Sequence, residues 1–158
     1  MFLLIACGNS LRQDDSAGLR LAEALAAAWE AAARPIRLVI VQQLTPELAL
    51  EIARPEICEV LFVDTRVARD VYDVAVETTA ISPTLGSPSL GHHLSPETLM
   101  FLTQALFDAR KDLIARQLTV PGFEFAHSEK LSEPCQAILN RVIQGEGAAA
   151  YARAIDCP

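Results

Sequence analysis

The chain has 158 residues, the size of a single domain with an ordinary hydrophobic core. Apolar residues make up 51% of it, 6% are aromatic, and the formal net charge is −7. Because the charge is negative and no basic run occurs, nucleic acid and anionic membranes are excluded as expected partners, and no apolar run is long enough to span a membrane.

The four cysteines have no CxxC spacing; they are Cys7, Cys58, Cys135 and Cys157. In a chain of this size they indicate buried free thiols in a reducing compartment, and a disulfide framework is not expected. The apolar start of the chain is interrupted at 9–15, too early for a signal peptide. We therefore expect a cytoplasmic protein whose one domain spans 1–158.

Apolar runs of strand length alternate with helical patterns along the chain. The run 2–6 is continuously apolar, which is typical of a strand buried on both faces, and 71–80 alternates as an edge strand does. This alternation predicts a three-layer αβα fold of the phosphorylase/hydrolase-like kind, with a mostly parallel five-stranded sheet and helices on both faces. The expected strands are 2–6, 36–41, 59–64, 71–80 and 113–120, and the expected helices are 16–33, 45–53, 95–110 and 131–144, with a terminal turn or helix at 148–154.

Capping residues and prolines set the expected bounds of these elements. Thr45-Pro46-Glu47 and Ser95-Pro96-Glu97 each supply a cap, a proline at the first helical position and an acid in the first turn. Pro121-Gly122 is expected to end the last strand. The segment 81–94 contains two prolines and two glycines and is predicted to be a long loop, whose length favours a functional role.

Acidic residues and histidines fall where a ligand site is expected. Asp14 and Asp15 follow the first strand, Asp64 ends the third, and His92 and His93 lie in the long loop. In a doubly wound sheet these places face one edge, beyond the carboxyl ends of the strands, where ligands bind. Two carboxylates and an imidazole suit a first-row divalent ion with open coordination positions.

Each of these residues also has a purely structural interpretation. Asp14 or Asp15 alone is more often a helix cap, an aspartate ending a strand often only binds loop amides, and a loop histidine is usually solvated. Cys7, which lies beside the turn, is a candidate nucleophile that would act together with a histidine. A small buried thiol is the commoner case. The residues taken alone predict an α/β domain with a candidate acidic metal site.

The order of the motifs resembles that of the [NiFe]-hydrogenase maturation endopeptidases, the family that trims the C-terminus of the hydrogenase large subunit. The segment 7–18, CGNSLRQDDSAG, is similar to the family's N-terminal signature G-x-G-N-x-L-x-x-D-D/E-G-x-G. The similarity covers nearly the whole chain. Its other parts are QLTPEL at 43–48, Val63-Asp64, His92 before LSPE at 94–97, VPG at 120–122 and KLSE at 130–133.

The resemblance implies an aspartic-type endopeptidase that removes the C-terminal extension of a nickel-loaded hydrogenase large-subunit precursor. It implies that Asp15, Asp64 and His92, with His93 as the fallback, are the metal ligands and catalytic residues. Asn9 and Asp14 would shape the turn and hold Asp15, the acid that binds the metal. The nickel would come with the substrate, no resident organic cofactor is implied, and the precursor would be the partner.

The chain departs from the family pattern close to this site. Ala6 and Ser16-Ala17 stand where the family has glycines, and Asp15 replaces the glutamate of many members. The change at Ser16 matters if the backbone there needs a positive φ. Two alternatives therefore stay open: a non-catalytic module that binds the nickel-loaded precursor or nickel itself, and a cysteine hydrolase that uses Cys7 with a loop histidine.

Overall fold

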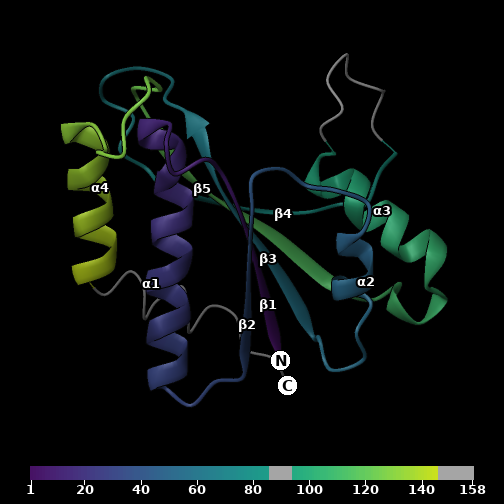
Figure 1. The fold of residues 1–158 in the computed structure, drawn as a ribbon. Coiled ribbons are helices and arrows are strands. Elements are labelled where there is room, and N and C mark those ends of the chain that lie inside the picture. The colour runs from purple at the N-terminus through teal and green to yellow at the C-terminus, as the bar shows by residue number, and fades with distance from the viewer. Residues whose placement is uncertain (86–93, 146–158) are drawn as a thin grey trace.

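A five-stranded sheet with the strand order β2-β1-β3-β5-β4 forms the centre of the fold (Figure 1). The computed structural model describes residues 1–85 and 94–145. Strands β1, β2, β3 and β5 are parallel, and β4 is antiparallel to β5. The elements are β1 (Phe2–Cys7), η1 (Gln13–Ser16), α1 (Ala17–Ala31), β2 (Ile36–Val41), α2 (Leu48–Ile52), β3 (Glu59–Val67), β4 (Glu77–Ala80), α3 (Pro96–Leu106), η2 (Asp108–Arg110), β5 (Ile114–Gly122) and α4 (Glu133–Gln144).

Helices cover both faces of this sheet, which confirms the predicted α/β fold class. Helices α1 and α4 lie on one face, and α2 and α3 lie on the other (Figure 1). Side chains alternate along β1: Leu4 and Ala6 belong to the apolar cluster under α1, whereas Leu3 and Ile5 belong to the cluster under α2 and α3. This double burial explains why β1 is continuously apolar.

Strands β3 and β5 both run further than the sequence predicts. They pair without interruption from Glu59 opposite Ile114 to Val67 opposite Gly122. Asp64 therefore lies within β3 and does not end it, and Pro121-Gly122 does not end β5 at 120. The ladder between the two strands outweighs the local turn signal, and Pro121 is accommodated near the end of the pairing.

The predicted strand 71–80 is wrong over its first half. Asp73 accepts hydrogen bonds from the guanidinium groups of Arg66 and Arg69, and from the backbone N–H of Arg69 at 2.9 Å. These ion pairs fold the chain into a turn, so only Glu77–Ala80 joins the sheet, as the antiparallel edge strand β4. A local alternation of residues does not reveal ion pairs of this kind.

The structure contains a helix at each of the four predicted places, but the ends of these helices differ from the prediction. Helix α1 begins at Ala17 after the single turn η1, and the helix expected over 95–110 is divided into α3 and η2. Ser95 caps α3 as expected, with its hydroxyl accepting from the Thr98 N–H at 3.2 Å. Thr45 does not cap α2, which begins later, at Leu48, without a side-chain cap. The segment 148–154 lies outside the described residues.

The prediction of four free thiols is wrong at Cys58, which is disulfide-bonded. Cys7 and Cys135 are free, as expected, and Cys157 lies outside the described residues. Spacing along the chain cannot reveal which cysteines the fold brings together, and this explains the error. Over residues 1–85 and 94–145, none of the helices has the length and apolar character needed to cross a membrane.

Candidate functional site

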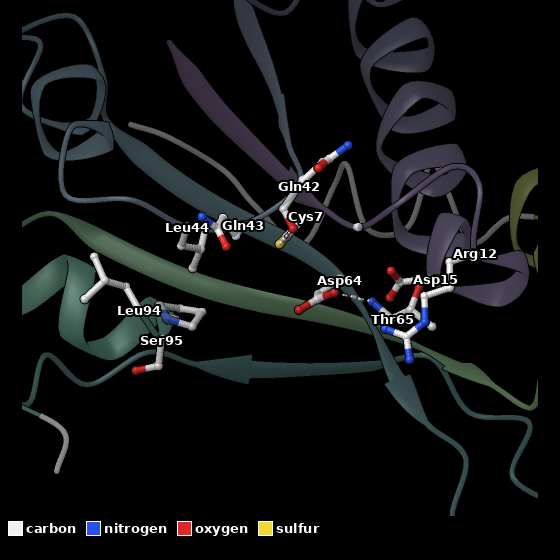
Figure 2. A pocket seen from close by; sticks show the side chains of 12 residues that line it. Cys7, Arg12, Asp15, Gln42, Gln43, Leu44, Asp64, Thr65, Leu94 and Ser95 are labelled. Atoms are coloured by element: carbon white, nitrogen blue, oxygen red, sulfur yellow. Dashed lines mark hydrogen bonds between the residues drawn. The ribbon is translucent and has the colours of Figure 1, made fainter. Parts of the chain in front are cut away.

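A cavity of about 460 Å³ opens at the carboxyl edge of the sheet. It is bounded by the loop after β1, the residues after β2, the end of β3 and the start of α3. The strand order reverses between β1 and β3, so the cavity lies at the topological switch point where open α/β sheets bind ligands. Asp15 and Asp64 both line it (Figure 2).

The loop after β1 folds back sharply to place Asp15. Gly8 has a φ of +153°, and a Cβ at that position would lie 2.2 Å from the Asp15 carbonyl oxygen, so only glycine fits. The Asn9 side-chain oxygen accepts from the Leu11 N–H at 2.9 Å, and the Asn9 N–H donates to Asp15 Oδ2 at 3.1 Å. Asn9 thus both closes the turn and contacts the carboxylate of Asp15.

The start of α1 packs closely against β3, which brings the second carboxylate to the same place. A Cβ at Gly18 would lie 2.8 Å from the Asp64 Cα, and the Gly18 N–H donates to Thr65 Oγ1 at 3.0 Å. Asp64 Oδ1 accepts from the Thr65 N–H at 2.7 Å. The contact between α1 and β3 therefore sets how the two carboxylates lie relative to each other (Figure 2).

Burial, with a smaller contribution from neighbouring charges, raises the pKa of two groups in the cavity. Burial raises the pKa of Asp64 to about 6; the hydrogen bond from Thr65 opposes this shift, and the negative charge of Asp15 adds to it. Burial likewise raises the pKa of the Cys7 thiol to about 11, with further contributions from Asp64 and Asp15. Cys7 is a protonated thiol whose Sγ donates to the Gln42 carbonyl at 3.4 Å, the opposite of an activated nucleophile.

Asp14 is fully buried and binds the segment between β5 and α4. Its Oδ1 accepts from the Ser132 N–H at 2.7 Å, and its Oδ2 accepts from the Ser132 hydroxyl, Phe123 N–H and Glu124 N–H at 2.6, 2.8 and 3.0 Å. Burial raises the pKa of Asp14, but these hydrogen bonds outweigh it and hold the pKa below its usual value. Asp14 therefore fixes the turn after β1 to the segment between β5 and α4.

The departure from glycine at position 16 has no effect on the backbone. Ser16 has a φ of −86° and a ψ of −4°, which any residue adopts, and its hydroxyl donates to the Gln13 carbonyl at 2.8 Å. The positive φ in this turn falls on Gln13, at 43°. The expected conflict at Ser16 does not arise, since the turn places its left-handed residue three positions earlier.

The structure brings together two of the three predicted metal ligands. His92 and the fallback His93 lie outside the described residues. Across 1–85 and 94–145, no group of three histidine, cysteine or acidic side chains converges closely enough to hold a metal ion. Two carboxylates supply hard oxygen ligands, which suits a divalent ion but leaves its other positions to further ligands.

Further polar residues line the cavity that were not predicted as site residues from the sequence, among them Arg12, Gln42, Gln43 and Thr65. The two glutamines directly follow β2, so the rule that singled out Asp64 would also have found them. Arg12 has no such signal, because its side chain reaches the cavity only through the fold of the β1–α1 loop.

The fold and the cavity define an α/β protein with paired carboxylates at its switch point. Among solved structures, the chain is similar to the [NiFe] hydrogenase maturation protease HybD from Thermococcus kodakarensis, with a TM-score of 0.62 and 17% identity over 98% of this chain and 99% of that one. HybD from E. coli, a hydrogenase maturating endopeptidase, matches with a TM-score of 0.62 and 17% identity over 98% and 94%. The maturation protease HycI from T. kodakarensis KOD1 matches with 0.61 and 20% over 90% and 87%.

These likenesses confirm the resemblance in the fold: the chain has the fold of [NiFe] hydrogenase maturation proteases over almost its whole length. No protein-family model matches the chain, and no curated protein matches it.

Proposed function

We propose that this protein is an endopeptidase that removes the C-terminal extension of a nickel-loaded [NiFe]-hydrogenase large-subunit precursor. The observation that carries the proposal is the placement of Asp15 and Asp64 in one cavity at the switch point of this fold. The similar solved structures are maturation proteases, which supports the same general activity.

In this proposal, Asp15, Asp64 and His92 bind the nickel that the precursor already contains. The metal is part of the substrate, and no resident organic cofactor takes part. Binding through these residues positions the scissile peptide bond beside them, and an aspartate of the pair serves as base toward the attacking water. A precursor without nickel would lack the ion that these ligands recognise. Cleavage would therefore occur only after the nickel has been inserted.

The test is cleavage of a hydrogenase large-subunit precursor from the same cell, supplied nickel-loaded and nickel-free. Mass spectrometry should detect a shortened subunit only with the loaded form. Asp64→Asn should reduce the cleavage rate at least about 100-fold, because an amide is a poor metal ligand and a poor base. Asp108→Asn is the matched control and should leave cleavage unchanged. Asp108 lies on η2 and forms an exposed ion pair with Lys111, which follows that turn.

Two results would contradict the proposal. Failure of the unaltered protein to cut the loaded precursor would remove the substrate assignment. Full activity of Asp64→Asn would remove the site assignment.

The alternative function, binding without cleavage, loses its main support in this structure. It depended on Ser16 preventing Asp15 from reaching the metal, whereas Ser16 has an ordinary conformation and Asp15 lines the cavity. Nickel titration combined with the mass measurement separates the two functions. In this proposal the peptidase acts in the cytoplasm.

A further inference from the structure

Among the described residues, the cavity contains a cation that forms no ion pair, Arg12. Of the described residues that line it, only Arg12 has a positively charged side chain, and it lies there with Asp15 and Asp64 (Figure 2). Within the described part of the chain, the Arg12 guanidinium forms neither a hydrogen bond nor an ion pair. It lies over the Phe125 ring, 5.8 Å from the ring centroid. A cation that shares a cavity with two carboxylates and pairs with neither is available to a ligand.

The backbone and the aromatic ring hold Arg12 in place. Its N–H donates to the Asn9 carbonyl at 3.0 Å, and its carbonyl accepts from the Asp15 N–H at 3.0 Å. Arg12 also forms a bridge with Ser128, which ties the loop to the segment before α4. Because the guanidinium lies over the Phe125 ring, its in-plane N–H donors remain free to bind oxygen atoms.

Peptide hydrolysis develops a negative charge on the oxygen of the scissile carbonyl. When water attacks the carbonyl carbon, this oxygen becomes an anion, and hydrogen-bond donors that are already in place stabilise it. Among the lining residues with described positions, Arg12 is the one side chain that supplies positive charge. Resting on the proposed function, we propose that Arg12 is a further catalytic residue, which donates hydrogen bonds to the oxygen of the scissile peptide carbonyl.

The reaction balances with water as the one co-reactant. The water oxygen forms a bond to the carbonyl carbon, and the π electron pair moves to the carbonyl oxygen, where Arg12 stabilises it. The C=O bond then re-forms and the C–N bond breaks, so that the nitrogen leaves as an amine with the proton that water gave up. Arg12 keeps all its protons, because a guanidinium does not deprotonate in proteins.

The test compares Arg12→Met and Arg12→Lys with the unaltered protein, using the nickel-loaded precursor and separate measurement of kcat and KM. Arg12→Met should lower kcat by roughly 100- to 1,000-fold, the usual effect of losing one donor to an oxyanion, with KM within about threefold. Arg12→Lys should keep part of the rate because it keeps the charge. Added guanidinium ion should restore activity to Arg12→Ala, a rescue that a merely structural residue would not show.

The control and the outcomes separate this inference from the proposed function. Arg54→Met removes the same charge from an exposed ion pair with Glu56 outside the cavity and should leave both constants unchanged. Unaltered kcat in Arg12→Met, or a rise in KM alone, would overturn the role of Arg12 while Asp64→Asn still tests the peptidase. Absence of cleavage by the unaltered protein would overturn both.

Discussion

At the scale of single residues, the adjacent acids Asp14 and Asp15 have opposite environments. Asp15 lines the cavity, whereas Asp14 is fully buried and accepts four hydrogen bonds from Phe123, Glu124 and Ser132. The sequence places both at the start of a helix and cannot separate them, because the partners of Asp14 are more than a hundred residues away along the chain. Only the tertiary structure distinguishes the buried anchor from the cavity residue.

Asp14→Asn should destabilise the protein by about 2–4 kcal/mol at neutral pH, because an amide replaces a buried carboxylate that accepts four hydrogen bonds. The folded state holds the pKa of Asp14 below its usual value, so the stabilisation is present above about pH 4 and is lost as the pH falls through the folded-state pKa. Urea denaturation at pH 7 and at about pH 3 should show the difference between the two proteins shrinking in acid.

The control for Asp14 is Asp108→Asn, which removes an exposed carboxylate. It should change the free energy of unfolding by less than about 0.5 kcal/mol at either pH. A pH-independent difference between Asp14→Asn and the unaltered protein would contradict the assigned ionisation.

Cys7 gives a second prediction at this scale. Because its pKa is raised to about 11, the thiol should react slowly with iodoacetamide at pH 8, and Cys7→Ala should retain its peptidase activity. Alkylation measured by mass on the intact, folded protein checks the first point, and cleavage of the loaded precursor checks the second. Loss of activity in Cys7→Ala, with unchanged thermal unfolding, would contradict this prediction and support the alternative that Cys7 is the nucleophile of a cysteine hydrolase.

At the scale of elements, the contact between α1 and β3 determines the geometry of the site. Gly18 lies on the first turn of α1, and its lack of a side chain allows the helix to approach the backbone of Asp64. Ser16, the departure from the family pattern that was expected to matter, lies two residues earlier, at the end of η1, and tolerates a side chain. At the contact between α1 and β3, the geometry therefore requires a glycine at Gly18 and not at position 16.

Gly18→Ala should push α1 away from β3, since the added Cβ would lie 2.8 Å from two backbone atoms of Asp64. We expect a loss of about 1–3 kcal/mol in the free energy of unfolding and a lower rate of precursor cleavage, because Asp15 moves relative to Asp64. Gly145→Ala is the control, at an exposed residue with a φ of −83°, and should be close to neutral. Equal activity and stability of the two variants would contradict the role of this contact.

At the scale of the whole molecule, the pattern of strands and helices could be predicted, but contacts between distant residues could not. Alternation of apolar and polar segments indicates the sheet and its layers, and the rule of strand ends leads to Asp15, Asp64 and their common edge. The turn around Asp73 was not predicted, because its ion pairs follow no periodic pattern. The disulfide at Cys58 was not predicted, because the spacing of cysteines does not reveal which of them are bonded. Arg12 was not predicted as a site residue either, because only the fold of its loop brings its side chain to the cavity.

The position of Asp14 has a consequence for how tightly the neighbouring carboxylate can bind a ligand. One peptide bond joins the two acids, so the hydrogen bonds that fix Asp14 also fix the backbone from which Asp15 extends. The conformational entropy of this loop is then lost during folding, and a ligand that arrives at the cavity does not have to order the loop again. More of the contact energy at Asp15 is thereby available as affinity.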